Sequence, residues 1–338
     1  MLLAWTFATL SALLLQSAPP PQSVPALNLT IGRDTNLLVI APHPDDEALG
    51  AAGLIQRVRA AGGSVRVVLM TSGDAFPEGV EAERHIRRPG PKDYRDYGNL
   101  RERETIAAME QLGVHRSHLL FLGFPDEGLC YIASTRGVAK ARVYKSSYTQ
   151  RVEPPSADQV VRGVEYRDSD VRRELAAILK AYRPTIIAVA TPDDDHPDHG
   201  ATGILVQEAV DAVRAERGGS PKPQVLEYLV HHDRWPDLKE SVDMPLEPPA
   251  DLPLLTGQWR SFALSDREVA RKRQVLERYP SQQLVLAPFL KAFGRPNELF
   301  IVGRADKRSE CWCDATHVAT GAAVEAVPRR HRHAVRKS

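Results

Sequence analysis

Short apolar runs alternate along the chain with longer segments that have the spacing of amphipathic helices. Runs with the length and β-branched content of buried strands lie at residues 35–41, 64–71, 118–122, 185–190, 224–231 and 298–303. Segments with apolar residues three and four positions apart lie at 47–60, 99–112, 168–182, 201–213 and 265–279. Strands that alternate with helices predict a mostly parallel sheet with helices on both faces, an α/β fold.

Three segments interrupt this alternation. Residues 74–98, 129–167 and 237–257 are rich in Gly, Pro and charged residues and show no sustained period, so we predict long irregular loops there. The first of them leaves the carboxyl end of a predicted strand. We therefore expect it to form part of the wall of a site at that edge of the sheet.

The predicted turn between the first strand and the first helix carries an unusual concentration of charge. Its sequence, residues 41–47, is Ala-Pro-His-Pro-Asp-Asp-Glu, which includes His43, Asp45, Asp46 and Glu47. Crowded carboxylates repel one another unless a positive charge neutralises them, and a histidine beside them favours zinc or another transition metal over calcium. The alternative is a set of acids that complements the dipole at a helix N-terminus.

A second cluster follows the predicted strand at 185–190 in the same way. Residues 193–200 read Asp-Asp-Asp-His-Pro-Asp-His-Gly, with His196, Asp198 and His199 just before the next helix. The carboxyl ends of the strands of a doubly wound sheet face one crevice. Two histidine–carboxylate clusters at these ends therefore predict a metal site.

Length and composition add few constraints. The chain has 338 residues, 43% hydrophobic and 26% charged, which suits one large α/β domain. A formal net charge of +1 gives no overall field that would attract nucleic acid. Residues 306–338 end in a basic stretch without apolar pattern, which predicts a disordered tail. The three cysteines, Cys130, Cys311 and Cys313, are too few for a disulfide framework, and Cys311 and Cys313 could pair or stay reduced.

The N-terminus has a separate character. Residues 1–17 carry no charged side chain and are mostly apolar, and a Pro-rich stretch follows to residue 25. This pattern predicts a signal peptide and a linker, and hence export to the periplasm or the extracellular space. The alternative is an uncleaved segment that anchors the protein to a membrane.

The motifs together resemble a known family. His-Pro-Asp-Asp-Glu at 43–47 and His-Pro-Asp-His at 196–199 resemble the PIG-L/LmbE-like zinc-dependent N-deacetylases, and the stretches 101–104, 112–114 and 122–126 do so as well. The resemblance covers about residues 35–303. It implies a single domain over 34–305, a Rossmann-like three-layer fold with long loops around the active-site crevice, and one zinc ion per chain.

The same resemblance implies roles for individual residues. It gives His43, Asp46 and His199 as zinc ligands and Asp45 as the general base. We expect a protonated His196 to stabilise the oxyanion and Asp198 to orient His196. Arg101 and Asp126 match positions that contact substrate in the family. The implied substrate is an N-acetylglucosamine-type sugar or glycoconjugate, a small molecule and not a nucleic acid.

Two other functions fit the same clusters. A phosphoesterase would use two metal ions, for which Asp193, Asp194 and Asp195 could supply ligands. A glycan-binding protein that kept the fold without catalysis would need a lost base or ligand, and none is missing. His231 and His232 follow another strand and are candidates for a supporting or substrate role. The sequence does not predict the oligomeric state.

Overall fold

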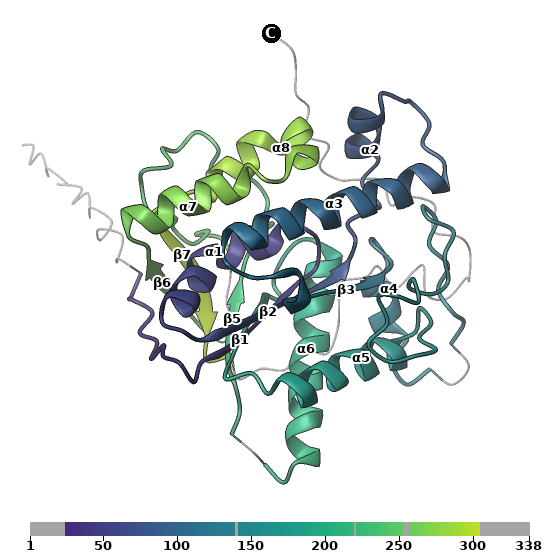
Figure 1. Cartoon of the computed structure of the whole chain (residues 1–338), viewed down its shortest axis with the longest axis horizontal. Coiled ribbons are helices and arrows are strands. Elements are labelled where there is room, and N and C mark those ends of the chain that lie inside the picture. The colour runs from purple at the N-terminus through teal and green to yellow at the C-terminus, as the bar shows by residue number, and fades with distance from the viewer. Residues whose placement is uncertain (1–23, 139–140, 220, 253–256, 305–338) are drawn as a thin grey trace, which may run out of the picture.

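Seven strands form one sheet in the order β3-β2-β1-β4-β5-β7-β6 in the computed structural model (Figure 1). The structure describes residues 24–138, 141–219, 221–252 and 257–304. The strands are β1 (Asn36–Ala41), β2 (Ser64–Thr71), β3 (Leu119–Phe124), β4 (Ile186–Ala190), β5 (Gln224–Tyr228), β6 (Gln258–Ala263) and β7 (Asn297–Val302). The first five pair in parallel, and β7 pairs antiparallel with both β5 and β6. The predicted α/β fold with a mostly parallel sheet is confirmed.

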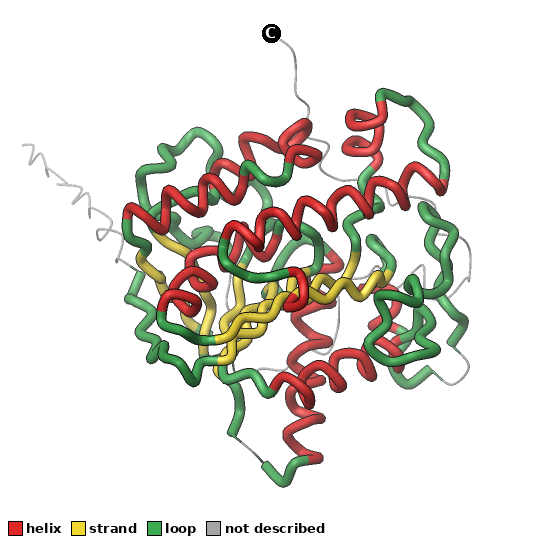
Figure 2. The backbone as a smooth tube through the Cα atoms, viewed as in Figure 1, coloured by secondary structure: helices red, strands yellow, loops and turns green. Residues whose placement is uncertain are grey.

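Helices cover both faces of this sheet (Figure 2). They are α1 (Asp46–Ala60), α2 (Pro77–Arg84), α3 (Pro91–Gln111), α4 (Leu129–Ser134), α5 (Asp168–Tyr182), α6 (Pro197–Glu216), α7 (Asp266–Leu276) and α8 (Pro280–Ala292), with a 3-10 turn η1 (Arg116–His118). In β1, Leu37 and Val39 point to the core under α1, α3 and α7, whereas Leu38 and Ile40 point to the core under α4, α5 and α6. The period-two alternation of a strand buried on both faces thus produces three layers.

The strand order reverses between β1 and β4. From β1 the chain moves outward through β2 to β3, and from β4 it moves outward the other way to β5. Because β1 and β4 are neighbours, with Ile40 opposite Val189, their carboxyl ends lie side by side. The point where the strand order reverses is the usual place for a binding site in an open α/β sheet. Both motifs lie there, directly after β1 and β4.

The approach of α1 to the sheet depends on small residues. A Cβ built at Gly50 would lie 2.5 Å from the ring of Tyr228 on β5, and one at Gly53 would lie 2.3 Å from Leu264. The two glycines therefore allow α1 to pack directly against the sheet. The N-terminus of α1 then lies over the point where the strand order reverses, between β1 and β4.

Several predicted boundaries need correction. The prediction of an irregular segment at 74–98 is wrong, because α2 and the first turns of α3 occupy it. Pro77 and Pro91 each stand at the first position of a helix, where proline has no hydrogen bond to lose. Strand β6 and helix α8 were not predicted; β6 is an edge strand with few buried residues, and α8 contains Pro288.

Of the other two predicted loops, 129–167 needs correction at its start, where helix α4 occupies residues 129–134. Between α4 and α5 the described residues form turns and bends, and no helix or strand lies in the described part of 237–257. At the other end of the fold, residues 24–31 pack against the core, and the amide of Leu27 donates to the Ser261 carbonyl on β6 at 2.8 Å. Residues 24–31 therefore belong with the core of the fold.

Candidate metal centre and active site

The loop between β1 and α1 places the first motif where the strand order reverses. The backbone amide of His43 donates to Asp46 Oδ2 at 2.9 Å, which closes the loop on itself. Asp46 opens α1, and Asp45 is its N-cap residue. The second motif sits on the first turn of α6, where His196 is the N-cap and Pro197 the first helical residue. Because α6 begins earlier than predicted, its helical geometry fixes the positions of Asp198 and His199.

Three predicted metal ligands converge on one point. His43 Nδ1, Asp46 Oδ2 and His199 Nε2 lie 3.1–3.2 Å from one another, and all three side chains are buried. Zinc ligands at about 2.0–2.1 Å in a tetrahedral arrangement are about 3.3 Å apart, so the spacing suits zinc. The ring nitrogens of His43 and His199 lie 3.1 Å apart, too close for both to carry a proton without repulsion. A cation in place of those protons would remove the repulsion, and the residues present fit one.

Each histidine of this triad has a second carboxylate behind it. His43 Nε2 lies 3.0 Å from Asp126 Oδ1, and His199 Nδ1 lies 3.1 Å from Asp194 Oδ2. Such carboxylates fix the ring orientation of metal-binding histidines and raise their basicity. Burial alone would lower the pKa of His199, but Asp194 and Asp46 outweigh it and raise that pKa to about 9. The arrangement therefore concentrates negative charge where a cation would bind.

Asp45 has a strained backbone and one charged partner. Its φ is 120° and its ψ −30°, a conformation that non-glycine residues rarely adopt. Its Oδ2 lies 3.2 Å from an amino group of Arg101, which also donates to the Pro44 carbonyl at 2.6 Å. Burial raises the pKa of the Asp45 carboxyl to about 8, although Arg101 partly opposes this. A carboxyl with a pKa near neutrality can both accept and return a proton.

Arg101 and Asp126 were predicted to contact substrate. Arg101 is buried, and its other amino group donates to the Gly73 carbonyl at 2.7 Å. Asp126 accepts from the Ala75 amide at 2.6 Å through the oxygen that does not face His43. Both residues therefore hold parts of the protein around the site. A direct contact with substrate stays a prediction.

His196 was predicted to be protonated. Its Nδ1 accepts a hydrogen bond from the Asp198 amide at 3.2 Å, so the ring proton belongs on Nε2. Burial lowers the pKa of His196 well below its usual value, and the nearby histidines lower it further. The hydrogen bond and the lowered pKa favour a neutral His196, and its protonation during the reaction stays a prediction. A neutral imidazole at a helix N-terminus can still donate one hydrogen bond from Nε2.

The carboxylate of Asp198 does not orient His196 in this structure. Its two oxygens accept from the amides of Glu127 and Leu129 at 2.7 and 3.0 Å, and one lies 3.6 Å from His43 Nε2. The backbone of Asp198 contacts His196, and its side chain ties α6 to the loop after β3. A negative charge behind His43 is the contribution that this geometry supports.

The three consecutive acids before His196 have other partners. Asp193 pairs with Arg304, and Asp194 accepts from His199 and from the amides of Val230 and His196. Asp195 accepts from the Asp233 amide at 2.7 Å. These contacts give all three acids a structural role in the loop before α6.

His231 borders the metal centre. Its ring centroid lies 4.9 Å from that of His199 and 5.5 Å from that of His196, and it stacks on Phe289 of α8. It also offers a nitrogen within 4.8 Å of ligand atoms of Asp46 and His199. His231 and His196 are partly exposed, unlike the buried triad, so they face the side from which a substrate would approach.

A profile of the family described as "PIG-L: GlcNAc-PI de-N-acetylase" matches residues 38–210, just over half of the 338-residue chain. The chain belongs to the PIG-L family. The matched range runs from β1 into α6 and so includes both motifs and every residue of the triad.

Two named relatives match about half of the chain. A 1D-myo-inositol 2-acetamido-2-deoxy-alpha-D-glucopyranoside deacetylase of Rhodococcus opacus is 29% identical over 189 residues, which is 54% of this chain and 56% of the relative. A diacetylchitobiose deacetylase of Thermococcus kodakarensis is 27% identical over 177 residues, 52% of this chain and 48% of the relative. The chain thus spans about half the length of the relatives it matches.

A solved PIG-L-like structure shares the fold. It is a triple mutant of a deacetylase from the teicoplanin biosynthetic pathway, with a TM-score of 0.50 and 19% identity over 80% of this chain and 99% of that one. At this identity the likeness concerns the fold alone. It confirms the predicted LmbE-like α/β architecture.

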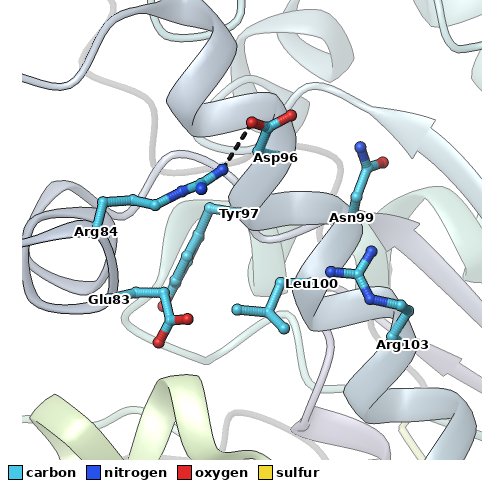
Figure 3. A pocket seen from close by; sticks show the side chains of 7 residues that line it. All are labelled: Glu83, Arg84, Asp96, Tyr97, Asn99, Leu100 and Arg103. Carbon is cyan, nitrogen blue, oxygen red and sulfur yellow. Dashed lines mark hydrogen bonds and ion pairs between the residues drawn. The ribbon is translucent and has the colours of Figure 1, made fainter.

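A separate hollow lies between α2 and α3 (Figure 3). It has a volume of about 240 Å³, and its lining consists of Glu83, Arg84, Asp96, Tyr97, Asn99, Leu100 and Arg103. Arg84 and Asp96 pair across it at 2.6 Å. None of the triad lines this hollow, so it is distinct from the metal centre.

Proposed function

We propose that the chain is a zinc-dependent N-deacetylase that removes acetate from an N-acetylglucosamine-type sugar or glycoconjugate. The observation that carries the proposal is the triangle of His43 Nδ1, Asp46 Oδ2 and His199 Nε2, with the Asp45 carboxyl on the adjacent residue. Three protein ligands leave a position open for water, which is the arrangement of catalytic zinc sites. The PIG-L relatives are named as deacetylases of acetamido sugars, which supports this substrate class.

The zinc ligands, Asp45 and His196 each have a separate role in the proposed reaction. Zinc held by the triad would lower the pKa of a water molecule and polarise the acetamide carbonyl. Asp45 accepts a proton from the attacking water and passes it to the amine nitrogen as the carbon–nitrogen bond breaks. The Nε2 hydrogen of neutral His196 donates to the carbonyl oxygen as negative charge develops on it. Acetate and a free amine leave.

The test is amine release from N-acetylglucosamine and its simple glycosides by purified protein. We expect Asp45→Asn to lower kcat by about 10²–10⁴. Its bound zinc should stay unchanged, because Asp45 is not a ligand in the proposal. Loss of zinc from the variant, or activity equal to that of the wild type, would remove Asp45 from the role of general base.

We further propose export, because residues 1–17 are uncharged and mostly apolar, as in a signal peptide. The predicted signal or anchor falls mostly in residues 1–23, outside the described residues, as do Cys311, Cys313 and the predicted basic tail. In the described ranges, none of the helices combines the length and the apolar character that crossing a bilayer requires. Intact mass of the protein from a cell-envelope fraction would test export, since removal of the leader changes the mass.

A further inference from the structure

The backbone of Asp45 stands apart from the rest of the described chain. The other non-glycine residues with positive φ there lie between 40° and 61°, within or near the left-handed helical region. Asp45, at 120°, lies outside it. A conformation of this kind costs about 1–3 kcal/mol and persists only where its surroundings enforce it. Some contact must therefore hold Asp45 in place.

Glu47 supplies that contact from within the same loop. Its Oε2 accepts the hydrogen bond of the Asp45 backbone amide at 3.0 Å. Its Oε1 accepts from the hydroxyl of Tyr279 at 2.6 Å. Glu47 and Tyr279 have no exposed surface, so water cannot take the place of either partner. Both oxygens of Glu47 are thus committed, one to each neighbour.

Tyr279 brings a distant part of the chain to this loop. It is the N-cap residue of α8 and lies 232 positions after Glu47. The first residues of α8 are tied down as well, since the Ser281 hydroxyl donates to Glu104 at 2.6 Å and the Gln282 amide to the Tyr97 hydroxyl at 2.7 Å. The start of α8 is therefore a fixed support for Glu47.

Neither residue has a part in the chemistry described above. Glu47 belongs to no group of described residues that could hold a metal ion, and the Tyr279 hydroxyl points to Glu47. Arg101 fixes the same loop from the other side through the Pro44 carbonyl and the Asp45 carboxylate. Glu47 thus holds the backbone amide of Asp45, and Arg101 holds its carboxylate.

We propose that Glu47 and Tyr279 are positioning residues that hold Asp45 in its strained backbone conformation and so aim its carboxyl at the reacting water. The inference rests on the proposed function, in which Asp45 is the general base. Two hydrogen bonds connect α8 to the site: the Tyr279 hydroxyl and the Asp45 amide both donate to Glu47. Tyr279 thereby fixes Glu47, and Glu47 fixes the backbone of Asp45.

Tyr279→Phe tests the inference, because it removes only the hydroxyl. We expect kcat to fall at least about tenfold, as misplacement of a catalytic group does, while KM and bound zinc stay within about twofold. Glu47→Gln keeps an acceptor for the amide and gains a donor for the hydroxyl, so it should retain more activity than Tyr279→Phe. Tyr182→Phe is the matched control: its hydroxyl bonds Ser64 and the Leu37 carbonyl, far from the site, and kcat should not change.

A double variant separates positioning from general loss of structure. In the Asp45→Asn background, Tyr279→Phe should lower kcat no further, because the group it positions is gone. An additional tenfold loss there, or an unchanged kcat in Tyr279→Phe alone, would overturn the inference. If the wild type released no acetate, the proposed function would fail by itself. A crystal structure of Tyr279→Phe would then decide: Asp45 still at a φ near 120° would refute the positioning role, and a relaxed Asp45 would support it.

Discussion

Replacement of Asp194 by Asn should weaken metal binding without removing a ligand. Asp194 Oδ2 accepts from His199 Nδ1 at 3.1 Å and from the amides of Val230 and His231 at 2.9 and 3.1 Å. Its Oδ1 accepts from the His196 amide at 2.9 Å. The side chain is fully buried beside His199. Asn keeps the shape but loses the charge, and its amino group cannot accept from a ring N–H.

The expected size follows from the role of such carboxylates. Loss of the partner behind a ligating histidine typically costs 10–100-fold in metal affinity, or about 1.4–2.8 kcal/mol. The free energy of unfolding should also fall by about 1–3 kcal/mol, since the amino group that the substitution introduces would face a backbone amide that now lacks its acceptor. The two effects can be measured separately.

Competition with a chelating dye on folded protein gives the zinc Kd directly. Asp195→Asn is the matched control, because Asp195 is half-exposed and accepts from the Asp233 amide away from the triad. Its zinc Kd should stay within about twofold of that of the wild type. A folded Asp194→Asn protein with an unchanged zinc Kd would refute the view that Asp194 supports His199 as a ligand.

Two further predictions concern stability. Lys272 and Glu298 form a pair 2.8 Å apart with 1% exposure each. Lys272→Ala should lower the free energy of unfolding by about 3–5 kcal/mol in urea titrations, because it leaves the buried Glu298 without a counter-charge, with only the Gly53 and Leu54 amides as donors among the described residues. A loss below about 1 kcal/mol would contradict this. Burial would raise the pKa of Glu268, but hydrogen bonds from Arg57 and Ser265 lower it to about 2. A lowered carboxyl pKa stabilises the fold above the ordinary value of 4.5, and this contribution disappears as the pH falls toward 2. The stability difference between wild type and Arg57→Gln should therefore shrink across that range, and a difference independent of pH would contradict the assignment.

The sequence predicts the centre of the sheet well, for a physical reason. Strands buried on both faces are mostly apolar, so β1, β2 and β4 appear as apolar runs whose limits fall within a residue of those observed. The edge of the fold lacks this signal. Strand β6 has one buried residue, Phe262, and reads as loop. Helices α2 and α8 begin with prolines that resemble loop residues unless their N1 position is recognised.

Part of the candidate site could also be predicted from the sequence, and part of it could not. The two clusters could be predicted because each motif is local and follows a strand whose end is fixed by the sheet, whereas the choice of His43, Asp46 and His199 within them came from the family resemblance. The partners of those residues could not, since they come from other elements. Nothing near Tyr279 in the sequence indicates a bond to Glu47, and the orientation of Asp198 away from His196 depends on where the loop after β3 lies. The hydrogen bond from the Asp198 amide to His196 Nδ1 likewise depends on a backbone contact that only the fold reveals.

Acetate release by protein of known zinc content is the sharpest test of zinc-dependent deacetylation at this site. Protein stripped of metal and reloaded with zinc would be assayed on N-acetylglucosamine, its simple glycosides and N,N'-diacetylchitobiose, alongside His199→Ala. The account predicts one zinc per wild-type chain, acetate release that stops on stripping and returns on reloading, and neither tight zinc nor release in the variant. A wild-type chain that binds a single zinc at His43, Asp46 and His199 and releases no acetate from any of these amides would contradict it.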